Sequence, residues 1–100
     1  DTIQAVIQGV NLSVDDYIRL GALALEQGRD SLAFALYKQG VTAHKDSSLL
    51  WNNLAWLGAR QPDFDQQAAL DAAAKAFTLD SNNPAIVDTY SMILLQRGKY

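Results

Sequence analysis

One apolar pattern recurs three times along this chain, and it limits the fold more than any other feature of the sequence. Its three occurrences are Tyr17-x-x-Leu20-Gly21, Trp51-x-x-Leu54-Ala55 and Val87-x-x-Tyr90-Ser91. Residues spaced i, i+3 and i+4 lie on one face of an α-helix. The units begin near residues 14, 48 and 84, and they are therefore about 34 to 36 residues apart. A helical unit of this length that repeats along a chain predicts an all-α array of helical hairpins.

Capping and turn residues place the helix boundaries. We expect six helices and no strand, with the helices near residues 3–10, 14–27, 31–44, 48–60, 68–79 and 84–97. The candidate N-caps are Ser13, Asp30 or Ser31, and Ser47 or Ser48. Asp16 completes a capping box with Ser13, and Leu12 and Tyr17 occupy the two positions of a hydrophobic staple. Gly28 is expected to end the helix that Ser13 begins.

Composition and charge exclude several classes of function. The formal net charge is −3 and the basic residues are not clustered, so the chain lacks the cationic surface with which proteins neutralise nucleic-acid phosphates. It has no cysteine and hence no disulfide or zinc-thiolate site. No apolar run approaches the roughly 18 residues of a membrane span. We therefore expect no nucleic-acid partner and no membrane insertion by this segment.

The repeated pattern resembles the tetratricopeptide repeat, whose unit of about 34 residues carries Trp-x-x-Leu-Gly-x-x-Tyr, then Ala-x-x-x-Phe and a proline. Asp80-Ser81-Asn82-Asn83 is similar to the Asp-Pro-Asn-Asn that joins units of this family. The resemblance implies a right-handed superhelical solenoid. It assigns residues 1–13 to the second helix of a preceding repeat, 14–47 and 48–83 to two full repeats, and 84–100 to the first helix of a truncated repeat. Because the chain starts on Asp1 and carries half a repeat at each end, we expect it to be a fragment of a longer array.

Three shorter stretches resemble a narrower group of proteins. Residues 52–56, 83–89 and 98–100 are similar to bacterial tetratricopeptide proteins of exopolysaccharide assembly and secretion, which often have Leu-Gly-Trp where this chain has Tyr90-Ser91-Met92. That resemblance implies a non-catalytic protein–protein interaction scaffold in an export complex of the bacterial envelope, located in the periplasm. The alternative is a stand-alone peptide-binding receptor of regulatory or chaperone type. A cytoplasmic location suits the cysteine-free composition equally well.

The family resemblance also implies a concave groove lined by the first helix of each repeat. In this register the candidate partner-binding residues are Arg19, Asn52, Asn53, Trp56, Arg60, Asp88 and Met92. Trp56 lies about 500° around the helix from Trp51, so Trp51 is expected to pack inside its hairpin while Trp56 faces the groove. Tryptophan and arginine are enriched at binding hot spots, and asparagine amides can bond to a peptide backbone. The alternatives are that Trp56 packs against a flanking helix and that Asn52 lies on a solvated helix face.

Residues suited to catalysis or metal binding are sparse. His44 is the only histidine, and we expect it at the surface near a helix end. Asp63 and Asp65 lack the further ligands of a calcium loop, so turn and capping roles are favoured for them. Of the positions that form the family's carboxylate clamp for chaperone tails, only Asn53 matches, and the others hold Ile18, Ala22, Ala85 and Thr89. We expect no catalytic activity, no metal and no cofactor, and a protein or peptide as partner.

The last helix is expected to present an uncovered apolar strip. The strip consists of Val87, Tyr90, Ile93 and Leu94. In the repeat register a following helix would cover it, because each repeat covers the apolar face of its neighbour. Exposed apolar strips mark interaction surfaces, so we expect self-association through this helix.

Overall fold

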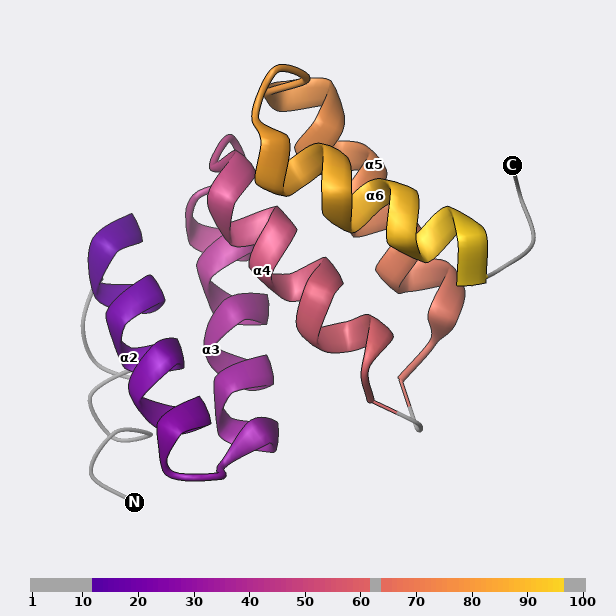
Figure 1. The fold of residues 1–100 in the computed structure, drawn as a ribbon. Helices are drawn as coiled ribbons and strands as arrows, with labels where there is room; N and C mark the ends of the chain where they lie inside the picture. Colours follow the sequence, from indigo (N-terminus) through magenta and orange to yellow (C-terminus); the bar gives the residue numbers. More distant parts are fainter. Residues whose placement is uncertain (1–11, 62–63, 97–100) are drawn as a thin grey trace.

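The computed structural model describes residues 12–61 and 64–96, and the secondary structure in these ranges is entirely α-helical (Figure 1). The helices are α2 (Val14–Glu26), α3 (Asp30–Ala43), α4 (Ser48–Ala59), α5 (Gln66–Leu79) and α6 (Pro84–Gln96). The all-α prediction is confirmed, and these helices lie close to the predicted ranges. The helix expected over residues 3–10 lies outside the described residues.

Local hydrogen bonds define both ends of α2. The Ser13 hydroxyl oxygen accepts from the Asp16 backbone N–H at 3.1 Å, and Asp16 Oδ2 accepts from the Ser13 N–H at 3.2 Å. This reciprocal pair is the predicted capping box. At the other end Gly28 has φ 72°, a conformation that residues with a Cβ rarely adopt. The N–H groups of Gly28 and Arg29 then bond to carbonyls in the last turn of α2 and close the helix.

A missing side chain lets α2 and α3 approach closely. A Cβ placed on Gly21 would lie 2.6 Å from Cζ and 2.7 Å from the hydroxyl oxygen of Tyr37. The Tyr37 ring is 4% exposed and fills the space that glycine leaves. Ala24 and Ala33 are both fully buried in the same hairpin. The first hairpin is therefore held by the Tyr37 ring of α3 against Gly21 of α2 and by small buried residues on both helices.

The N-caps of the next two helices fit the sequence in one case and not in the other. The N-cap of α3 is Arg29, so the prediction of Asp30 or Ser31 is wrong. Asp30 is instead in the first turn, where a carboxylate interacts favourably with the helix dipole. Ser47 caps α4 as expected, since its side chain accepts from the Leu50 N–H at 3.3 Å.

An aspartate caps the N-terminus of α5, and the helix packs through alanines. Asp65 Oδ1 accepts from the Gln67 N–H at 2.9 Å, which is an N-capping bond. The capping role of Asp65 is thus confirmed, whereas Asp63 lies outside the described residues. The most deeply buried side chains of α5 are small, and they are Ala69, Ala73 and Ala76. Small side chains allow α5 to lie close to α4.

The helix α6 packs through residues that the repeat pattern did not select. Its buried residues are Ile86, Thr89 and Ile93. The pattern placed Val87 on the packing face, but Val87 is 37% exposed. α6 lies against both α4 and α5. Because contact with two helices buries a wide stripe, the packing face is centred on Ile86 and Ile93 rather than on Val87.

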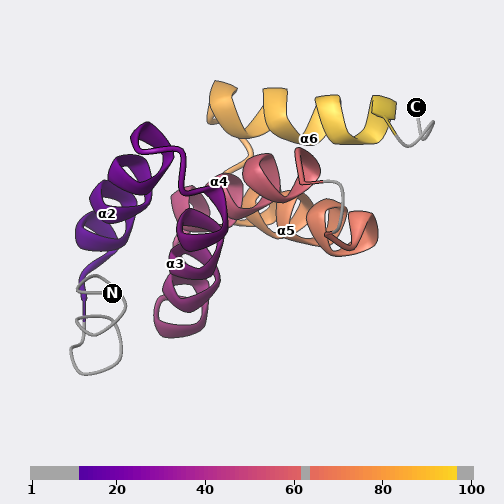
Figure 2. The same ribbon diagram turned by 90° about the horizontal axis from the view of Figure 1, so that it is seen from below.

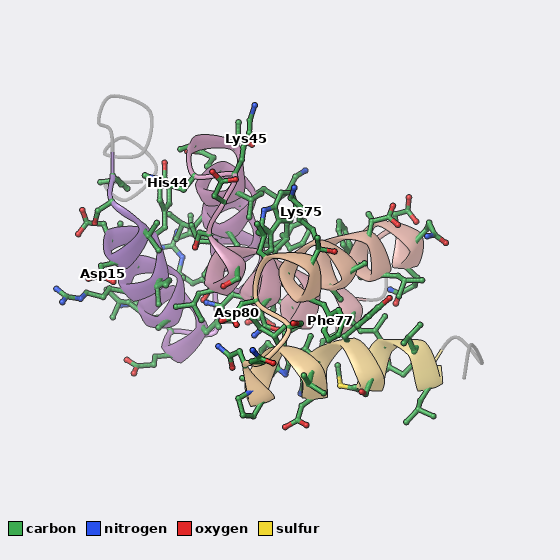
Figure 3. The ribbon with its side chains drawn as sticks, turned by 90° about the horizontal axis from the view of Figure 1, so that it is seen from above. Asp15, His44, Lys45, Lys75, Phe77 and Asp80 are labelled. Carbon is green, nitrogen blue, oxygen red and sulfur yellow. The ribbon has the colours of Figure 1, made fainter. Side chains whose placement is uncertain are left out.

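The apolar strip expected on α6 is only partly exposed. Ile93 is 1% exposed, and Tyr90 is half-buried. The Tyr90 ring lies against Phe77, with 5.3 Å between the ring centroids, and Figure 3 shows Phe77 between α5 and α6. The prediction of an uncovered strip is therefore wrong for Ile93, while Tyr90 and Leu94 are half-buried. The large apolar side chains of this helix that are exposed are Val87 and Leu95, and Leu95 is 62% exposed.

The helix α4 occupies the centre of the fold. It contacts each of the other four described helices. Figure 2 shows α2, α4 and α6 in succession along one side, with α3 and α5 on the other. The array is elongated, with extents of 42 × 26 × 19 Å. Because α4 contacts both α2 and α6, these three helices form one face of the molecule.

Two aromatic side chains that join helix ends differ from their predicted settings. His44, labelled in Figure 3, is half-buried rather than at the surface. Its Nε2–H donates to the Leu12 carbonyl oxygen at 2.7 Å, and its ring forms a T-shaped pair with the Tyr17 ring. Trp51 is half-buried rather than enclosed in its hairpin. Its indole N–H donates to the carbonyl oxygen of Lys45 at 2.8 Å. Both bonds fix the turns that lead into α2 and α4.

Candidate functional site

A hollow of about 410 Å³ lies between α4 and α6 on the face formed by α2, α4 and α6. Its lining residues are Asn52, Asn53, Trp56, Ala85, Asp88, Thr89 and Met92. We refer to it below as the α4–α6 hollow. Of the candidate binding residues, the structure brings five together in this lining, and these are Asn52, Asn53, Trp56, Asp88 and Met92.

Two polar residues form the floor of the α4–α6 hollow. Asn52 is 8% exposed and Thr89 is 6% exposed. The Thr89 hydroxyl donates to the Ala85 carbonyl oxygen one turn earlier, at 3.0 Å. The Oδ1 atom of Asn52 is buried and has no hydrogen-bond partner among the described residues. Asn52 thus lies in the lining of the hollow. The alternative, a solvated helix face, is wrong for Asn52, because α6 lies against α4 and covers most of this side chain.

The rim of the α4–α6 hollow is more open than its floor. Trp56 is 38% exposed, and the Arg60 guanidinium carbon lies 4.6 Å from the centroid of its ring. A cation at this distance over an indole is attracted by the ring quadrupole and restrains the ring. Asn53 and Met92 are half-buried and Asp88 is exposed. Trp56 therefore borders the α4–α6 hollow and is not packed under a flanking helix.

The structure separates one candidate residue from the others. Arg19 is exposed on α2 and does not line the α4–α6 hollow. Arg60 does not line it either, but it reaches the site through its contact with Trp56. Ala85 and Thr89 line the hollow although the sequence did not single them out as binding residues. Their helical register placed them on the groove face, yet a methyl group and a hydroxyl in a helix carry no binding signal of their own.

The lining of the α4–α6 hollow carries negative charge, and the Arg60 guanidinium lies outside that lining, against the Trp56 ring. Asp88 is the only charged residue in its lining, and no lysine or arginine is part of that lining. The remaining polar groups are the two amides of Asn52 and Asn53 and the hydroxyl of Thr89. The apolar walls are the Trp56 indole and the Met92 thioether. The hollow thus combines hydrogen-bond acceptors with two polarisable apolar surfaces.

A second hollow, of about 440 Å³, lies at α3, α4 and α5. It is lined by Lys38, Trp51, Leu54, Phe64, Ala68, Asp71, Ala72 and Lys75. Its one acidic residue, Asp71, accepts a hydrogen bond from the Gln67 side chain at 3.0 Å. None of the predicted binding residues lies here, so this surface supplies control positions for the experiments below.

Groups that could perform chemistry are dispersed. Within residues 12–61 and 64–96, no group of three or more His, Cys, Asp or Glu side chains is placed to hold a metal ion. In the same part of the chain, none of the helices combines the length and the apolar character that crossing a membrane requires. The imidazole of His44 is hydrogen-bonded to the Leu12 carbonyl oxygen.

Comparisons with protein-family models, with curated proteins and with solved structures find no match to this chain.

Proposed function

We propose that this chain is a segment of a tetratricopeptide-type array and that it recognises a protein segment, without catalysis, through the α4–α6 hollow. The array proposal is supported by α2, α4 and α6, which begin at Val14, Ser48 and Pro84, close to the spacing of that repeat. It is supported also by the succession of α2, α4 and α6 along one face. In such arrays the face formed by the repeats is an extended binding surface.

The single observation that carries the binding proposal is Trp56. An indole that is 38% exposed, held by Arg60 and set at the rim of a hollow, has the character of a binding hot spot. The Trp56 side chain loses little conformational freedom on binding because Arg60 already restrains it. Asn53 beside it has both donors and an acceptor for a peptide backbone.

The setting we propose for this module is a bacterial exopolysaccharide assembly in the periplasm. Only the resemblance of residues 52–56, 83–89 and 98–100 supports that part of the proposal. The alternative setting is a stand-alone peptide receptor. The α4–α6 hollow has the same recognition role in both.

Selection of peptides from a displayed random library tests the binding proposal. We expect selected peptides to perturb the NMR signals of Asn53, the Trp56 indole and the Met92 methyl group. The Trp56→Ala variant should bind them about 30-fold more weakly, since a hot-spot residue contributes roughly 2 kcal/mol or more.

The matched control is Leu23→Ala, because Leu23 is an apolar side chain of similar exposure, 41% against 38%, that lies on α2 and outside the α4–α6 hollow. This variant should bind the selected peptides as the parent does. Equal binding by Trp56→Ala, or a footprint confined to other helices, would refute the proposal.

A further inference from the structure

Three observations at the α4–α6 hollow bear on the chemistry of its occupant. They are a carboxylate without a basic neighbour in the lining, a buried amide oxygen without a donor, and an indole beside a thioether. All of these groups attract cations or N–H donors. This inference rests on the proposed function and names the partner's chemistry at the same site.

The carboxylate of Asp88 sets the charge preference. It is exposed, and none of the residues lining the hollow with it is basic. A cationic side chain entering here gains a charge-assisted hydrogen bond, which is stronger than a neutral one. An acidic side chain would be repelled by the same group, so a carboxylate-bearing segment is the poorer partner.

The amide of Asn52 adds an acceptor that the fold leaves unused. Its Oδ1 is buried without a donor among the described residues. Leaving a buried acceptor unpaired costs stability, so a ligand donor that satisfies it recovers that cost on binding. The terminal torsion of asparagine is broad, so the Asn52 amide can rotate to meet a donor in the hollow. A group with several N–H donors can then bond to Asn52 and Asp88 together.

The walls of the hollow suit the stem of such a side chain. Lysine and arginine carry apolar methylene stems below their charged ends. Trp56 and Met92 present an aromatic face and a thioether to that stem. The Trp56 ring already holds the guanidinium of Arg60 at 4.6 Å, so the methylene stem of the ligand, and not its charged end, is placed against the indole.

We propose that the α4–α6 hollow binds a lysine or arginine side chain of an extended segment of a partner protein. The charged end bonds to Asp88 and Asn52, the stem lies against Trp56 and Met92, and Asn53 bonds to the partner's backbone. The buried amide oxygen of Asn52, which has no donor among the described residues, is thereby a binding group that the isolated chain maintains at a cost to its own stability.

Blocked synthetic peptides that differ at one central residue test this assignment. That residue is lysine, norleucine, which keeps the stem without the charge, or glutamate. We expect the lysine peptide to shift the Trp56 indole and Met92 methyl signals at the lowest concentration, the norleucine peptide to bind about tenfold more weakly and the glutamate peptide more weakly still. If the norleucine or glutamate peptide binds as well as the lysine peptide, the assignment is wrong.

Charge reversal at Asp88 sharpens the test. Asp88→Lys should invert the order, so that the glutamate peptide binds better than the lysine peptide. The control Asp71→Lys makes the same change of net charge at the second hollow and should leave the order unchanged. If Asp71→Lys also makes the glutamate peptide bind better than the lysine peptide, overall charge rather than the α4–α6 hollow decides binding, and the proposal is overturned.

Asn52→Leu separates a binding role from a structural one. This change replaces a buried side chain whose oxygen has no donor with an apolar one of similar size. It should therefore raise the melting temperature and weaken the binding of the lysine peptide several-fold. Unchanged affinity would refute the role of Asn52. Library-selected peptides that occupy the hollow without any lysine or arginine would refute this inference but leave the proposed function intact, whereas peptides that never reach the hollow would refute both.

Discussion

Replacing Gly21 with alanine should destabilise the protein even though alanine is the better helix former. The new Cβ would lie 2.6 Å from Cζ and 2.7 Å from the hydroxyl oxygen of Tyr37, about 1 Å inside the ordinary carbon contact of roughly 3.5–4.0 Å. Tyr37 is 4% exposed, so its ring has little free volume into which to move. Overpacking costs about 1–3 kcal/mol, and the gain in helix propensity over glycine is about 1 kcal/mol. The net loss is therefore up to about 2 kcal/mol.

The effect of Gly21→Ala on stability should change sign when a smaller side chain replaces the Tyr37 ring. Leucine at position 37 lacks the outer ring atoms and the hydroxyl group that the new Cβ would meet. In a Tyr37→Leu background, Gly21→Ala should stabilise the protein by about 1 kcal/mol, which is the propensity term alone. The two backgrounds should thus differ by about 1–3 kcal/mol, the coupling expected for residues in contact.

Urea unfolding followed by circular dichroism measures both effects, and thermal melts should move by roughly 4–8 °C for each kcal/mol. The control is Ala22→Gly, at an exposed neighbouring position of α2, which should lose about 1 kcal/mol in either background. Equal stabilisation by Gly21→Ala in both backgrounds would show that α2 and α3 do not approach through Gly21.

Three further predictions concern other parts of the structure. Trp51→Ala should cost roughly 2–3 kcal/mol, less than the 3–5 of an enclosed aromatic residue, because the ring is half-buried and holds one hydrogen bond to backbone; a urea titration that finds no loss would contradict this. Burial raises the pKa of the Tyr37 hydroxyl above its ordinary value of 10.0. The unfolded chain therefore releases this proton first, and stability should fall as the pH rises above about 10. Tyr37→Phe lacks this group, so its unfolding midpoint should depend less on pH in that range. The exposed side chains of Val87 and Leu95 should drive weak self-association, which Val87→Glu combined with Leu95→Glu should abolish in sedimentation velocity. A parent chain that stays monomeric at high concentration would contradict this prediction of self-association.

Local signals made most of the helix boundaries predictable. Ser13 and Asp16 form their capping box from residues three apart, and Gly28 ends α2 through its own backbone conformation. Neither event needs a distant partner, so short sequence patterns are sufficient to predict it. The orientation of Trp56 relative to Trp51 was also predictable, because it follows from helix geometry alone.

Long-range packing explains what the sequence could not predict. His44 is half-buried because its partner is the carbonyl group of Leu12, and a backbone acceptor has no signature in the sequence. Asn52 is buried only because α6 covers it, and α6 in turn packs through Ile86 rather than Val87 since it meets two helices at once. In the candidate site the register brought five of the seven candidate residues into one lining but not Arg19 or Arg60. The division into a buried floor and an open rim was not predictable from the register.

The central position of α4 has a consequence for how the protein opens. A helix that contacts every other described helix cannot lose its amide protection until the whole array comes apart, whereas α2 and α6 can fray separately. Amide hydrogen exchange should therefore be slowest in α4 and should report global unfolding there. Because the α4–α6 hollow joins this slowest helix to a fraying one, an occupant that bridges the two should slow exchange along α6 and leave α2 unaffected. In nearest-neighbour terms, recognition would strengthen the interface at one end of the array and thereby extend the cooperative unit from α4 into α6.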